Sequence, residues 1–272
     1  MHIASAIEPF DVFAVKYAEH RRTASSNFLG GDPHDGPMPM DYFVWVATNS
    51  TGTWVIDTGF NQATARQRGR DFIRCPAESL RMIGIDAAAV DNVIITHLHY
   101  DHVGNFDLFP SATYHLQDHE MAFATGRHMA YTCAHEAYDV ENVVGMVREV
   151  YRGRVQFHDG DATLTPGLSV HLVGGHTMGL QVVRIFTRRG WVVLASDASH
   201  YYRNFIEDRP FPIVFNVDDM RSGWARIRSL ADSEHHIVPG HDPLVMNRYP
   251  PLAGASEGSI CVLHEPPHIG DS

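Results

Sequence analysis

Short apolar runs separated by turn sequences fill the first half of the chain. The run YFVWVAT, which follows Asp41, and the run TWVIDTG (53–59) are separated by NSTG, whose residues favour tight turns. This pattern predicts two strands joined as a hairpin. Further along, VDNVIITH (90–97) is typical of a buried strand, and ATYHLQ (112–117) predicts another strand.

Helical patterns lie between and after these runs. PAESLRMIGI (76–85) opens with a proline, which suits the first turn of a helix, and DHEMAFATG (118–126) and HEAYDVENVVGMVREVY (135–151) also predict helices. The clearest pattern is DDMRSGWARIRSLAD (218–232). It has an acidic start and an apolar stripe formed by Met220, Trp224, Ile227 and Leu230.

The second half returns to strands, in the segments 155–176 and 181–197, and a last apolar run leads into PGHD (239–242). Two β-rich stretches are thus each followed by helices, without Ser/Pro-rich linkers or short-period repeats. This order predicts an α/β protein in which two sheets pack together between helical layers. We expect one domain over residues 1–272.

Composition narrows the class of protein. The 272 residues are 44% apolar, enough for a large core, and the net charge is −11 without a basic block, which disfavours nucleic acid and anionic membrane surfaces as partners. The three cysteines are far apart and odd in number, so we expect no disulfide framework and a reducing, cytoplasmic location. The N-terminus carries Glu8 and Asp11 where a signal peptide would be apolar, and no apolar run approaches the ~20 residues of a membrane span.

The segment HLHYDH, directly after the strand 90–97, holds the candidate chemistry. His97 and His99 share a face of an extended segment and can reach one cation, whereas Asp101 and His102 point elsewhere, which predicts two metal ions. Neutral imidazoles with a carboxylate suit zinc, iron, manganese or cobalt. The alternative is a polar strand end with solvated histidines, in a chain that has 19 of them.

This segment matches the H-x-H-x-D-H signature of the metallo-β-lactamase-fold hydrolases, and the resemblance extends from VIDTG (55–59) to PGHD. It implies an αββα sandwich of two mixed β-sheets flanked by helices. It also implies two divalent metal ions per chain, with zinc favoured over iron, manganese or cobalt. The implied ligands are His97, His99 and His176 for one ion and Asp101, His102 and His241 for the other, with Asp197 bridging both and Asp57 orienting a ligand histidine.

Other readings of these residues fit less well. IDTG (56–59) also matches the active-site triplet of aspartic proteases, but it occurs once in a chain too long for their dimeric forms. Within the metallo-β-lactamase fold, His99 disfavours the flavodiiron oxidoreductases, and Asp197 in place of a cysteine disfavours the common zinc β-lactamases. The RNA-processing members carry a basic exosite and the glyoxalase II thioesterases a C-terminal helical domain, and we find neither here.

The chain is similar in length and layout to the N-acyl-homoserine lactonases. The resemblance implies that a metal-bridging hydroxide opens a lactone ring while Asp101 or Asp197 passes a proton to the leaving oxygen. The lactonase tyrosine three residues after the bridging aspartate is replaced by His200, so His200, Tyr201 or Tyr202 is expected to polarise the carbonyl. The alternatives are hydrolysis of an aryl ester, amide, phosphotriester or activated ring carbon, and a non-catalytic or redox member.

Loops are expected to shape the substrate pocket. The Gly- and Pro-rich segment 21–43 predicts a lid, and Tyr100 is expected to face the metals. The segment MAFATGRHMAYTC (121–133) holds apolar residues that suit the core better than the pocket. Its only obvious cation is Arg127, which favours a small, uncharged lactone or ester as substrate. The sequence leaves a homodimer open.

Overall fold

The computed structural model describes residues 7–255 and 258–268. Its larger sheet has eight strands in the order β13-β1-β2-β3-β5-β6-β7, with β4 paired to β1. The neighbours of β1 and the β2–β3 pair are antiparallel, whereas β3, β5, β6 and β7 run parallel. The strands are β1 (Asp11–His20), β2 (Met40–Asn49), β3 (Gly52–Ile56), β4 (Asp71–Phe72), β5 (Asn92–Ile94), β6 (Thr113–Gln117), β7 (Val155–His158) and β13 (Ile260–Val262).

The smaller sheet has five strands in the order β12-β11-β10-β9-β8. Its pairs are antiparallel except for β11 and β12, so both sheets are mixed. Its strands are β8 (Ala162–Thr165), β9 (Leu168–Leu172), β10 (Gln181–Thr187), β11 (Gly190–Ser196) and β12 (Ile237–Pro239).

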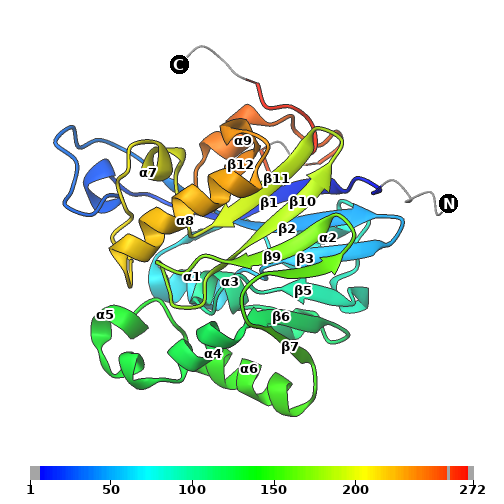
Figure 1. The fold of residues 1–272 in the computed structure, drawn as a ribbon, viewed down its shortest axis with the longest axis horizontal. Helices are drawn as coiled ribbons and strands as arrows, with labels where there is room; N and C mark the ends of the chain where they lie inside the picture. The colour runs from blue at the N-terminus through cyan, green and yellow to red at the C-terminus, as the bar shows by residue number, and fades with distance from the viewer. Residues whose placement is uncertain (1–6, 256–257, 269–272) are drawn as a thin grey trace.

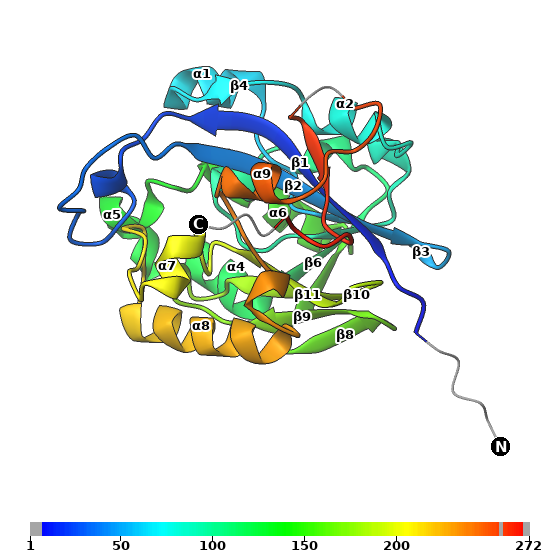
Figure 2. The ribbon, with the colours of Figure 1, turned by 90° about the horizontal axis from the view of Figure 1, so that it is seen from above.

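The two sheets pack face to face between helices, as Figures 1 and 2 show: α1 and α2 lie outside the larger sheet and α8 lies outside the smaller one. Strand β2 explains why the layers stay together, because both of its faces are buried. Phe43 and Trp45 enter the core between the sheets, whereas Tyr42 and Val44 enter the core under the outer helices. The expected αββα sandwich is confirmed.

Four of the helices in the described residues lie largely within the four predicted ranges, and the others were not predicted. The helices are α1 (Gln62–Arg68), α2 (Pro76–Arg81), α3 (Tyr100–Val103), α4 (Asp118–Ala124), α5 (Thr132–His135), α6 (Val140–Tyr151), α7 (Tyr202–Ile206), α8 (Val217–Leu230) and α9 (Leu244–Arg248). Short 3-10 turns link several elements, at Ala24–Ser26, Ala87–Ala89, Phe106–Leu108, Arg127–Ala130 and Glu234–His236. In the described ranges no helix has the length and apolarity to cross a membrane.

Two of the local predictions are confirmed and one is wrong at its start. The hairpin of β2 and β3 is confirmed, and the predicted apolar stripe of α8 is buried. The helix predicted over 135–151 is wrong at its start, because α6 begins only at Val140. There the side chain of Asp139 accepts a hydrogen bond from the backbone N–H of Glu141 and caps the helix. The preceding turn, α5, is a separate helix.

Candidate metal centre

The seven residues expected to bind metal converge at the carboxyl ends of strands. His97 and His99 follow β5, and Asp101 and His102 lie in α3 directly after them. His176 lies between β9 and β10, Asp197 follows β11, and His241 follows β12. The parallel pairing of β3 with β5 and of β11 with β12 places these ends together. All seven side chains are buried.

The first group of donor atoms gathers around one oxygen of Asp197. His99 Nδ1 lies 3.0 Å from His97 Nε2 and 2.9 Å from His176 Nε2. Asp197 Oδ2 lies 3.1 Å from His176 Nε2 and 3.7 Å from His97 Nε2. Three imidazole nitrogens and one carboxylate oxygen therefore converge on a single point, which is a tetrahedral-type donor set suited to zinc.

The second group gathers around the other oxygen of the same carboxylate. Asp197 Oδ1 lies 3.0 Å from His241 Nε2 and 3.4 Å from His102 Nε2. Asp101 Oδ2 completes this group, 3.6 Å from His102 Nε2 and 3.8 Å from His241 Nε2. Asp197 thus directs one oxygen to each group, the arrangement of a bridging carboxylate.

Hydrogen bonds behind the rings fix their orientation. His102 Nδ1 donates to Asp57 Oδ2 at 2.7 Å, which is the role expected of Asp57. His176 Nδ1 donates to the backbone oxygen of Ile213 at 2.7 Å, and His241 Nδ1 to that of Asp41 at 2.8 Å. Because a neutral imidazole has one N–H, these bonds leave Nε2 as a lone-pair donor toward the centre.

The electrostatics of the cluster suit divalent cations. Burial and the neighbouring histidines hold the pKa of His97 and His99 well below the usual range, so both rings are neutral. Burial alone would lower the pKa of His102, but the charges of Asp197, Asp101 and Asp57 outweigh it and raise that pKa well above the usual value. The carboxylates therefore favour positive charge at this point.

Two buried polar atoms support the same conclusion. Within the described ranges, His102 Nε2 and Asp197 Oδ1 lack a hydrogen-bond partner. A buried nitrogen and a buried oxygen that face each other without a bond are costly unless a cation lies between them. The cluster is thus compatible with a dinuclear metal site.

Two aspects of the backbone are unusual at this centre. Asp57 has φ 61° and Ser196, directly before Asp197, has φ 45°. Both lie in the left-handed region, which costs free energy for residues other than glycine. Strain at the ends of β3 and β11 aims the side chains of Asp57 and Asp197 toward the histidines.

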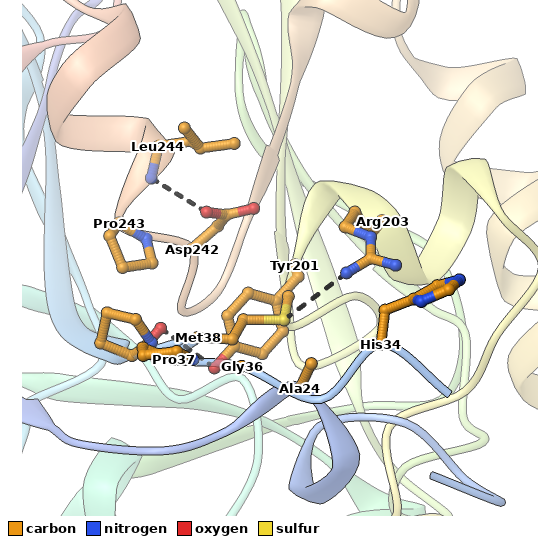
Figure 3. Close-up of a pocket in the computed structure, with 11 residues that line it drawn as sticks. Ala24, His34, Gly36, Pro37, Met38, Tyr201, Arg203, Asp242, Pro243 and Leu244 are labelled. Atoms are coloured by element: carbon orange, nitrogen blue, oxygen red, sulfur yellow. Dashed lines mark hydrogen bonds between the residues drawn. The ribbon is translucent and has the colours of Figure 1, made fainter. Parts of the chain in front are cut away.

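His200 joins the cluster, whereas the two tyrosines after it face elsewhere. His200 Nε2 lies 3.0 Å from Asp197 Oδ2, and its ring stacks on Phe211 with centroids 3.7 Å apart. Tyr201 donates to the backbone oxygen of Pro39 at 3.3 Å and lines a neighbouring cavity of about 380 Å³ (Figure 3). Tyr202 is buried in the core between the sheets.

A cavity of about 230 Å³ opens over the cluster. Tyr100 lines it, as expected, and so does Met40 from the end of the predicted lid segment. Arg22 and Tyr42 of the same segment also line it. The lining residues outside the predicted segments include Arg68, Arg70, Phe211 and Ile213. Three arginines therefore line the cavity. Arg22 comes from the predicted lid segment, whereas Arg68 and Arg70 come from segments that the sequence did not connect with the metal motif.

The segment 121–133 supplies core residues in part, as expected, whereas Tyr131 is exposed and Cys133 lines the cavity. Phe123 is buried in the core beneath the outer helices, and Met121 and Met129 pack against it. The buried carboxylate of Glu120 was also missed. It accepts hydrogen bonds from the backbone N–H of Leu98 at 2.9 Å and from Thr177 Oγ1 at 2.6 Å, and so connects the two loops that carry the first group of histidines. No periodic signal distinguishes such a glutamate from a solvent-exposed one.

Comparisons with known proteins agree with this geometry. The family described as "Metallo-beta-lactamase superfamily" matches residues 38–241. The N-acyl homoserine lactonase AttM of Azorhizobium caulinodans is 29% identical over 232 residues, which cover 78% of this chain and 85% of that protein. A solved structure described as a quorum-quenching N-acyl homoserine lactone lactonase superposes with a TM-score of 0.73 at 21% identity, covering 87% of this chain and 94% of the other.

Proposed function

We propose that this chain, which belongs to the metallo-beta-lactamase superfamily, is a dinuclear-metal hydrolase that opens the ring of a small lactone. The observation that carries the proposal is the pair of donor groups that share Asp197, one on each carboxylate oxygen. The similarity to AttM favours a lactone among the substrates that such a centre can attack. The alternative is another ester, amide or phosphotriester substrate at the same centre.

The seven candidate ligands form two groups, one for each ion. His97, His99 and His176 with Asp197 Oδ2 would hold one ion, and Asp101, His102 and His241 with Asp197 Oδ1 the other. When bound, the two ions supply Lewis acidity and lower the pKa of water toward neutrality. Zinc suits the mixed nitrogen and oxygen donors best.

We assign the proton transfer during hydrolysis to Asp101. Both oxygens of Asp197 face histidine nitrogens of the two ligand groups. Asp101 directs only Oδ2 to the histidines, and its side chain is 11% exposed toward the cavity. A carboxylate at this place can take a proton from the attacking water and return it to the leaving oxygen. His200 lies beside Asp197 at the same wall, where an N–H can donate to the substrate carbonyl.

Metal content tests the centre directly. Purified protein should carry about two divalent ions per chain. His99→Ala and Asp197→Asn should each lower both the metal content, measured by elemental analysis, and turnover. His119→Ala is the matched control, because that imidazole is half exposed on α4 outside the cluster. Full activity after exhaustive chelation would contradict the metal-dependent mechanism.

The substrate class needs a separate assay. A panel of lactones, aryl esters, amides and phosphotriesters, scored by acid release from the metal-loaded enzyme, should show the highest kcat/KM for a lactone. A clear preference for one of the other classes would contradict the lactone assignment but would not contradict the metal centre.

A further inference from the structure

Three arginines share the cavity of the candidate metal centre. Arg22 follows β1, Arg68 ends α1, and Arg70 directly precedes β4. All three are half-buried and line the cavity that His99, His176, His200 and His241 also line. The three arginines and five of the seven expected metal ligands therefore line the same 230 Å³ space.

Neutral groups hold these arginines in place. Arg22 Nε donates to Asn27 Oδ1 at 2.6 Å, and Arg70 Nε donates to the hydroxyl of Tyr100 at 3.1 Å. Arg68 donates to the backbone oxygens of Glu136 and Tyr138, and its guanidinium lies 3.9 Å from the centroid of the Tyr100 ring. The side chains are thus oriented without losing their charge.

None of the three guanidiniums has a carboxylate partner within 4 Å in residues 7–255 and 258–268. In the same ranges, Arg184 and Arg189 likewise donate to backbone oxygens without an ion pair. What distinguishes Arg22, Arg68 and Arg70 is that all three line one cavity. Elsewhere, arginines such as Arg203, Arg209 and Arg221 do pair with carboxylates. Half-buried arginines that point into one cavity with only neutral partners leave charge available for a ligand.

The charges of two of these arginines act on a neighbouring histidine. Arg70 Nη1 lies 3.2 Å from His20 Nε2, so the imidazole accepts a hydrogen bond from the guanidinium and is neutral. Burial, and then the charges of Arg70 and Arg22, lower the pKa of His20 to about 4. The charges of Arg70 and Arg22 thus add to the effect of burial and outweigh the opposing charge of Asp71.

Bound metal would add positive charge to the cavity. The three guanidiniums balance the carboxylates of Asp101, Asp197 and Glu136, which line the same cavity. Two divalent ions would therefore leave the space with a net positive charge. An acyl chain or an uncharged ring does not use that charge, whereas an anion does.

We propose that the substrate is a compact lactone or ester that carries a permanent carboxylate, bound by Arg22, Arg68 and Arg70 while the reacting carbonyl lies at the metals. This inference rests on the proposed hydrolase function and adds the charge of the substrate to it. A guanidinium fork matches a carboxylate geometrically. The volume of about 230 Å³ lies below that of most drug-sized pockets, which favours a small ring over a long acyl chain.

A matched pair of substrates tests the proposal. The γ-lactone 5-oxotetrahydrofuran-3-carboxylate and its 3-carboxamide have nearly the same shape and differ in charge. With the metal-loaded enzyme, kcat/KM for ring opening should be about ten- to a hundredfold higher for the carboxylate, the range expected for charge-assisted hydrogen bonds. A preference for the carboxamide would overturn the proposal.

Variants connect the preference to the arginines. Arg22→Gln and Arg70→Gln should each reduce the ratio of the two kcat/KM values about tenfold. Arg21→Gln is the control, because it removes the same charge from a neighbouring side chain that is 92% exposed and pairs with Asp71 outside the cavity. If the Arg22 and Arg70 variants lost kcat/KM equally on both substrates, these residues would not recognise the carboxylate. They would instead support the fold or stabilise charge that develops in the reaction, and this result would also overturn the proposal.

Binding separates this proposal from the lactonase proposal. If neither lactone is opened, lactone hydrolysis fails, but the arginines can still be tested with succinate, which is not hydrolysed. Calorimetry should then show at least tenfold weaker succinate binding to metal-loaded Arg70→Gln than to wild type and Arg21→Gln. Equal affinities in all three proteins would show that the arginine groups do not bind a carboxylate.

Discussion

Asp197 is the residue on which the candidate centre depends most. Its two oxygens face different donor groups, and the pKa of its carboxyl lies well below the usual range because the charges of His200, His241, His102 and His176 outweigh the effect of burial. Replacing this carboxylate with an amide would therefore take an oxygen from one group and remove the negative charge that both groups share. This is the physical reason why Asp197→Asn should lower metal content more than the loss of a single histidine.

The role of His200 is a prediction at the same scale. If its N–H polarises the carbonyl, His200→Ala should lower kcat and kcat/KM together by roughly ten- to a thousandfold, because the bond strengthens as the oxyanion develops. Metal content should stay unchanged. Tyr201→Phe and Tyr202→Phe are the comparison variants and should have small effects, since both side chains face away from the cluster.

Three other outcomes would change this assignment. Loss of metal in His200→Ala would show that the ring holds Asp197 in place and does not polarise the carbonyl. A larger loss in a tyrosine variant would transfer the role to that tyrosine. A higher KM with unchanged kcat for one substrate class would make His200 a binding residue.

At the scale of elements, helix α4 fastens the two loops that carry the first histidine group. Glu120 on α4 is fully buried and accepts four hydrogen bonds, from the backbone N–H groups of Leu98 and Gly179 and from the hydroxyls of Thr177 and Tyr138. Leu98 lies between His97 and His99, and Thr177 follows His176. Burial raises the pKa of Glu120, while these bonds favour its charged form.

Glu120→Gln should therefore disturb the metal site without touching it. An amide cannot accept all four hydrogen bonds, so we expect a loss of about 1–3 kcal/mol in the free energy of unfolding. Metal affinity should fall about ten- to a hundredfold, measured by competition with a chelator. Glu141→Gln on the exposed side of α6 is the control. Unchanged metal affinity in Glu120→Gln would limit the role of Glu120 to stability.

At the scale of the whole molecule, buried histidines outside the centre make stability depend on pH. His115 on β6 lies between Asn92 and His158, with Nε2 3.3 Å from Asn92 Oδ1 and Nδ1 3.1 Å from His158 Nε2. A neutral ring donates to Asn92 and accepts from His158, and protonation would place two N–H groups against each other. Burial, and then His158, lower the pKa of His115 to about 4.

The sign of the pH effect follows from this shift. Between pH 6.5 and pH 4 the unfolded chain binds a proton at His115 that the folded chain does not, so stability falls as the pH falls through this window. Between pH 7 and pH 5 we expect this group to contribute about 1–2 kcal/mol to the loss. His115→Gln should show a correspondingly smaller decrease in the free energy of unfolding, measured by urea titration. A chelator present throughout keeps metal release out of the comparison, and equal pH dependence in both proteins would contradict the assignment.

The sequence by itself determined the architecture and the metal motif. Helix α8 has periodic apolar residues, which reflects local helix geometry, and strand β2 is a continuous apolar run, which is typical of a strand buried on both faces. His97, His99, Asp101 and His102 lie within six positions, so chain connectivity alone brings them together. The remaining ligands follow apolar strands, and their order along the chain identified them through the family resemblance.

Only the tertiary structure decided the charge of the cavity and the support of the site. Arg22, Arg68 and Arg70 lie outside the metal motif in the sequence, and an arginine is normally solvent-exposed unless distant segments enclose it. Glu120 has the same property, because its role depends on loops far away in the chain. Such contacts arise from packing between elements, and no local period records which elements will meet.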